Sequence, residues 1–147
     1  MTARSETWRM PAGEFAQSES RARMSRVLAE LERATQHPDE EAVHDLRVAI
    51  RRLSQALRIF SGLLPAKGAR KVRQRLKVVL DAAAVVRDLD VGLELLLECG
   101  VEESEPLVAE MRLERKRAEL FLVGQVCLLR SEDLEKDWSA KLGWEAL

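Results

Sequence analysis

The chain has 147 residues, of which 33% are charged and 46% apolar, and a formal net charge of −1 at neutral pH. This length fits one domain, and the few Gly and Pro residues and the absence of Tyr favour helices over turn-rich sheet folds. The first ten residues are too polar for a secretory signal, and the longest apolar run, residues 120–129, is too short to span a membrane. We therefore expect an all-α, cytoplasmic protein.

Apolar residues at helical spacing predict four helices, with an N-terminal arm at residues 1–17 before them. The predicted helices span residues 18–36, 39–64, 66–99 and 104–130. Asp39 is the expected N-cap of the second helix, Gly92 is a potential kink in the third, and Gly100 is its expected stop. Short connections make neighbouring helices antiparallel, so residues 18–131 predict a four-helix bundle with long helices, followed by a short helical piece at 132–147.

The sequence also predicts which apolar surfaces and thiols are buried. The fourth helix ends in LFLVGQVCLL, which is apolar on nearly all sides, whereas a helix at the rim of a bundle needs one apolar stripe. Either the C-terminal piece with Trp138 and Trp144 or a second subunit is expected to cover the other side. Cys99 and Cys127 lack CxxC spacing, so we expect two reduced, buried thiols.

The middle of the chain is strongly basic although the whole is nearly neutral. Residues 44–77 contain ten Lys and Arg residues and a single acid, Asp45. Such a local field of one sign attracts polyanions.

The basic residues of the second and third helices fall on narrow stripes. At about 100° per residue, one stripe lies opposite the apolar side of the second helix and contains His44, Arg47, Arg51, Gln55 and Arg58. Arg70, Arg73 and Lys77 form a similar stripe on the third helix. Arginine favours bidentate hydrogen bonds to phosphate oxygens, so the two helices predict a cationic groove. The alternative is that these charges are solvated or pair with acids of the first and fourth helices.

Two stretches resemble the motifs of the CHAD family (conserved histidine α-helical domain). VHDLRVAIRRLSQALRIF, at residues 43–60, resembles the first motif, and RLKVVLDAAAVVRDLDV, at residues 75–91, resembles the second. The resemblance implies an all-helical fold that binds inorganic polyphosphate in a basic channel between two four-helix halves. This chain has room for one half, so it is either a fragment or, as we expect, forms a two-fold homodimer.

The resemblance also implies site residues. In the first motif the basic positions are His44, Arg47, Arg51, Arg52 and Arg58, and in the second they are Lys77 and Arg87. Together with Arg70 and Arg73 from the helical stripe, they make the predicted polyphosphate site. Asp88 and Asp90 match the acids of the second motif, and we hypothesise that they orient neighbouring basic side chains. Arg52 lies at about 80° from His44 on the helical wheel, so the stripe alone does not include it. Ser54 and Ala84 depart from the basic residue and the glycine that the family often has.

Other functions remain open on the sequence. HDLR also resembles the phospho-accepting box of sensor histidine kinases, which makes His44 a candidate for phosphotransfer, although Val48 and Ala49 replace that box's usual polar residue and Pro. Nucleic acid is a less favoured partner, because Phe60 is the only aromatic residue of the second and third helices and lies on the core face. Docking of an acidic protein is a further alternative. A protonated His44 could donate to a bound phosphate, better at mildly acidic pH.

The sequence does not predict an enzyme. We find no pair of acids, no metal-ligand set and no nucleophile with a base, so neither catalysis, a metal nor a cofactor is expected. The ExExK motif of the CYTH-type triphosphatases that often accompany the family is also missing, since the nearest string, ELERA at residues 30–34, is helical in pattern and lacks the Lys.

Overall fold

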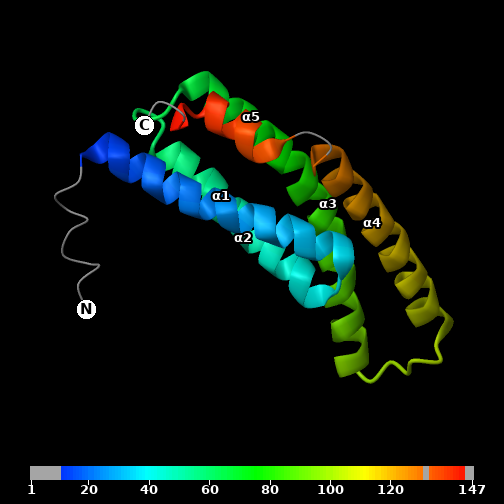
Figure 1. Cartoon of the computed structure of the whole chain (residues 1–147). Coiled ribbons are helices and arrows are strands. Elements are labelled where there is room, and N and C mark those ends of the chain that lie inside the picture. Colours follow the sequence, from blue (N-terminus) through cyan, green and yellow to red (C-terminus); the bar gives the residue numbers. More distant parts are fainter. Residues whose placement is uncertain (1–10, 131–132, 145–147) are drawn as a thin grey trace.

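The computed structural model describes residues 11–130 and 133–144, and in this part the chain is all-α (Figure 1). The helices are α1 (Ala12–Gln36), α2 (Glu40–Ile59), α3 (Ala66–Glu98), α4 (Pro106–Arg130) and α5 (Leu134–Lys141). The predicted fold class is therefore confirmed. Residues 1–10 of the predicted arm, and residues 131–132 and 145–147 near the C-terminus, lie outside the described residues.

Helix α1 begins earlier than the sequence pattern indicates. Pro11 precedes its first turn, where the missing N–H costs nothing because that group has no partner inside a helix. Ala16 is buried, and the ring of Phe15 meets Phe60 edge-to-face at a centroid distance of 5.9 Å. The prediction of a helix start near Ser18 is wrong, because apolar contacts already fix the preceding turn.

Helix α2 has the expected start and an earlier end. The side chain of Asp39 accepts a hydrogen bond from the backbone N–H of Ala42 at 2.8 Å, which confirms the predicted N-cap. The helix ends at Ile59 rather than at Leu64, and residues 60–64 form turns. Pro65 disfavours helical backbone at the residue before it, so the chain turns and buries Leu64 instead.

Helix α3 runs for 33 residues without interruption, and α4 returns antiparallel beside it (Figure 1). Gly92 does not break α3. A Cβ added at Gly92 would lie 3.0 Å from Cε of Met111, so the glycine allows α4 to approach closely. The predicted stop is confirmed, because Gly100 follows the helix with a φ of 87°, in the left-handed region that glycine tolerates.

Contacts of α1 with α2, α2 with α3, α3 with α4 and α1 with α4 make the four-helix bundle. The apolar side of α2 supplies much of its core, and each buried Leu or Ile there stabilises the fold by about 1.5–3 kcal/mol relative to an exposed one. The fully buried large residues of α2 are Leu46, Ile50, Leu53 and Leu57. Because this side is fixed in the core, the opposite side with its basic residues faces outward.

Helix α5 packs on α3, and the segment that follows it reaches α1. Trp138 and Trp144 are both buried, and Arg21 of α1 donates a hydrogen bond to the backbone oxygen of Trp144 at 2.5 Å. At the start of α3, a Cβ added at Gly68 would lie 1.9 Å from the backbone oxygen of Lys141, so only glycine permits this contact. The apolar residues of the C-terminal piece are therefore buried against α1 and α3, and do not cover α4.

The outer side of α4 stays uncovered within the described residues. The relative exposures of Leu120, Phe121 and Leu128 are 62%, 61% and 66%. Leu128 lines a shallow depression together with Val78 of α3, and the same antiparallel register brings Val85 to the level of Phe121. We call these five residues the apolar face.

The two cysteines are exposed and free, so the prediction of buried thiols is wrong. Cys127 lies on the exposed side of α4, and Cys99 follows the last residue of α3, where the chain turns at the tip of the α3–α4 hairpin (Figure 1).

Candidate anion-binding site

The four arginines of α2 form no ion pair with any described residue. They are Arg47, Arg51, Arg52 and Arg58. The nearby acid Asp45 does not pair with these arginines, because it accepts a hydrogen bond from Arg33 of α1 at 2.7 Å. This hydrogen bond is the main reason why the pKa of Arg33 is raised. The outer side of α2 therefore carries positive charge that the described part of the chain does not neutralise.

Arg47 is the most constrained of these arginines. Its side chain is half-buried, and its Nε is buried without a hydrogen-bond partner. Burial lowers the pKa of Arg47, and the neighbouring charges of Arg51 and Arg87 lower it further, with Asp88 acting in the opposite direction. A desolvated cation with an unused donor is a position that an anionic oxygen would stabilise.

Helices α2 and α3 together form a cationic groove of about 350 Å³. Arg58 of α2 and three predicted residues of α3 line it, namely Arg70, Arg73 and Lys77. Nε of Arg73, like that of Arg47, is buried without a partner. Lys77 donates to Asp81 at 2.7 Å in an exposed pair, which stabilises by only a few tenths of a kcal/mol and does not prevent Lys77 from meeting an anion. The structure thus places the α3 stripe beside Arg58, whereas the other predicted α2 residues, His44, Arg47 and Arg51, do not line this groove.

The predicted residues of the second motif also make contacts inside the fold. Arg87 donates to Glu40, in the first turn of α2, at 2.9 Å. Asp90 accepts from Arg115 of α4 at 2.9 Å, so the acid orients an arginine outside the predicted set. The positive charge of Arg87 is therefore partly compensated, unlike that of the α2 arginines.

Arg115 joins three segments of the fold. It pairs with Asp90 and with Glu119, and it donates to the backbone oxygen of Pro38 at 3.0 Å. Burial lowers the pKa of Arg115, but its hydrogen bond to Asp90 and the charge of Glu119 outweigh burial and raise the pKa overall. This cluster holds the turn before α2 against α3 and α4, and so fixes where the basic residues of α2 begin.

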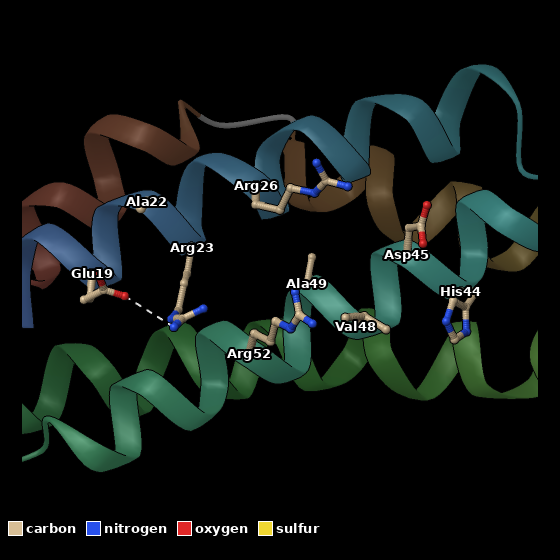
Figure 2. A pocket seen from close by; sticks show the side chains of 9 residues that line it. All are labelled: Glu19, Ala22, Arg23, Arg26, His44, Asp45, Val48, Ala49 and Arg52. Atoms are coloured by element: carbon tan, nitrogen blue, oxygen red, sulfur yellow. Dashed lines mark hydrogen bonds and ion pairs between the residues drawn. The ribbon is translucent and has the colours of Figure 1, made fainter. Parts of the chain in front are cut away.

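His44 and Arg52 lie on the other side of α2, towards α1. They line a second groove, of about 660 Å³, together with Arg23 and Arg26 of α1 (Figure 2). The sequence prediction does not include these two arginines, because the helical wheel of α2 shows which side faces outward but not which helix lies beside it. The closely spaced arginines of RARMSR, at residues 21–26, are the signal that points to them.

A family model described as the CHAD domain matches residues 20–146, which is nearly the whole chain. The chain belongs to the CHAD domain family. The match extends from α1 past α5 and contains both motifs, which the structure places on α2 and α3. No curated protein and no solved structure matches the chain significantly.

Two further properties of this CHAD domain concern its described residues only. None of its helices has both the length and the apolar character needed to cross a membrane. No group of three or more His, Cys, Asp and Glu side chains among these residues could hold a metal ion.

Proposed function

We propose that this CHAD domain binds inorganic polyphosphate without catalysing a reaction on it. The observation that carries the proposal is the pair of buried, unpartnered Nε donors on Arg47 and Arg73, which lie on adjacent helices. A linear chain of phosphates offers oxygens at short, regular intervals, so successive guanidinium groups can each be satisfied. Affiliation with the CHAD family favours the same ligand.

The exposed surface of α2 and α3 favours polyphosphate over single-stranded nucleic acid. Binding of single strands relies on aromatic side chains on which bases stack. Phe60, the aromatic residue next to α2, is only partly exposed and packs against Phe15. Phosphate groups are thus the part of a nucleic acid that this surface can contact.

The test is a calorimetric titration with long-chain polyphosphate. The variant Arg47→Ala/Arg51→Ala removes two charge-assisted contacts of about 1.5–3 kcal/mol each, so we expect its affinity to fall at least about 100-fold. The matched control is Arg112→Ala/Arg117→Ala, which removes the same charge from exposed positions on α4. Equal affinity of the site variant and the wild type would remove the proposal.

Two additional assays separate the competing functions. Competition between polyphosphate and duplex DNA at several salt concentrations shows which polyanion is preferred, since both depend steeply on salt. Incubation with a labelled phosphodonor tests phosphotransfer, which would modify His44 covalently. Under our proposal polyphosphate wins the competition and His44 stays unlabelled.

We also propose that two copies associate through the apolar face of α3 and α4. The face remains exposed after α5 has packed elsewhere, and an exposed apolar area of this kind commonly marks a protein interface. Light scattering at micromolar concentration should give a dimer, and Phe121→Glu should give a monomer with unchanged helicity. The control Ile59→Glu changes an exposed apolar residue away from this face. A monomeric wild type would refute the dimer.

A further inference from the structure

The exposed half of α2 carries positive charge on both flanks. At about 100° per residue, Arg47 points towards α3, while Arg51 lies along the outermost ridge. Arg52 lies about 80° beyond His44, on the flank that faces α1. Because none of these arginines has an ion pair in the described residues, a band of uncompensated charge continues from one groove to the other.

Helix α1 extends this band across the groove. Arg23 reaches from α1 towards α2 and Arg52, and Arg26 lies one turn further along α1 (Figure 2). His44 lies at the far end of the same groove. The α1–α2 groove, with its volume of about 660 Å³, is the larger of the two cationic grooves.

The acids in this groove are occupied by partners. Glu19 pairs with Arg23 at 3.3 Å, and both side chains are more than a third exposed, so the pair is weak. Asp45 is held by Arg33 from outside the groove lining. The groove therefore retains the positive charge of Arg52, and an incoming phosphate can compete with Glu19 for Arg23.

Arg26 is also available to a ligand. It contacts Glu30 at 2.7 Å, but its side chain is 66% exposed whereas that of Glu30 is 5% exposed. Glu30 is held as well by Arg33 at 3.5 Å. Because a guanidinium group carries five N–H donors, the exposed Arg26 can meet a phosphate while it keeps its contact with Glu30.

We propose that the α1–α2 groove is a second phosphate subsite, in which Arg23, Arg26 and Arg52 bind the continuation of a polyphosphate chain that has crossed the α2 ridge. This inference rests on the proposed function and adds to it two α1 residues outside the CHAD motifs found in this chain. It also implies a requirement for length. A tripolyphosphate is too short to engage both flanks of α2, whereas a long chain reaches both.

The test compares tripolyphosphate and long-chain polyphosphate by calorimetry on Arg23→Gln/Arg26→Gln and on the control Arg112→Gln/Arg117→Gln. We expect the groove variant to bind long chains about 5- to 20-fold more weakly and tripolyphosphate within about twofold of the wild type. Each lost contact should also reduce the slope of log affinity against log salt by about one. Arg23→Gln alone is a second variant, since its pair with Glu19 is exposed and its loss leaves the fold intact.

The outcomes are distinguishable. If the groove variant loses no more affinity for long chains than the control does, the second subsite is overturned, while the proposed function still stands on Arg47 and Arg51. If the groove variant lost equal affinity for tripolyphosphate and for long-chain polyphosphate, the claim that one polyphosphate chain crosses the α2 ridge would be overturned. If the wild type binds neither anion, the proposed function fails, and the second subsite fails with it.

Discussion

Replacing Arg47 with Met should make the ligand-free domain more stable and the loaded domain less stable than the wild type. Met keeps most of the apolar stem of Arg47 in the bundle and removes the guanidinium group. That group is unfavourable without a ligand, because its Nε is buried without a partner and Arg51 and Arg87 repel it. The same group is a contact for phosphate in the loaded state.

The magnitudes follow from these contacts. A buried unpaired donor costs about 1–3 kcal/mol, and since the rest of the Arg47 side chain reaches solvent, we take the lower end, about 1 kcal/mol. For a domain of this size, that raises Tm by about 2–4 °C. At a polyphosphate concentration 100-fold above Kd, the wild type gains about 2.7 kcal/mol. A variant with about 10- to 100-fold lower affinity gains only about 0.4–1.4 kcal/mol.

The assay is thermal denaturation followed by circular dichroism, with and without long-chain polyphosphate. We expect Arg47→Met to melt above the wild type without ligand and below it with ligand. A ligand-free variant that melts below the wild type would show that Arg47 stabilises the fold. Identical shifts with polyphosphate in both proteins would show that Arg47 does not contact the ligand.

Three further predictions test the fold and the role of His44. Gly68→Ala places a Cβ 1.9 Å from the backbone oxygen of Lys141, so α5 must move, and we expect Tm to fall by at least about 5 °C with a red shift of tryptophan fluorescence; an unchanged Tm would refute the tight contact. Asp90→Asn removes the negative charge that pairs with Arg115 in a mostly buried cluster. The free energy of unfolding in urea should therefore fall by about 2–3 kcal/mol. A loss below about 0.5 kcal/mol would mean that the ion pair is dispensable. His44 lines the α1–α2 groove, so His44→Gln should weaken the binding of long-chain polyphosphate in calorimetry, and equal affinity of both proteins would exclude a role for His44.

Local signals in the sequence predict the helices well where one residue type has one physical role. Asp39 accepts the hydrogen bond expected of an N-cap, and Gly100 adopts the left-handed backbone expected at a helix end. The ends that the sequence misplaces depend on tertiary contacts instead. Phe15 and Ala16 are helical because they pack on the bundle, and Leu64 turns inward before a proline.

The candidate site is also predicted only in part, because the sequence shows local periodicity but not tertiary contacts. A helical wheel finds the outward side of α2 and groups Arg47 with Arg51, since both follow from the period of one helix. It cannot show that Arg52 faces α1, nor that Arg23 lies across a groove from it, because the pairing of helices sets those positions. The partner of Asp45 is missed similarly, since Arg33 belongs to another helix.

The hydrogen bond between Arg21 and Trp144 joins residues 123 positions apart. During synthesis, α1 leaves the ribosome long before residues 135–144, which lie beside Met24 and its neighbours, so this side of α1 stays in contact with water until those residues emerge. The hairpin of α1 and α2 can form early from local contacts, but the domain closes only after the segment up to Trp144 has been synthesised. Nascent chains stalled before residue 138 should therefore be sensitive to proteolysis within α1.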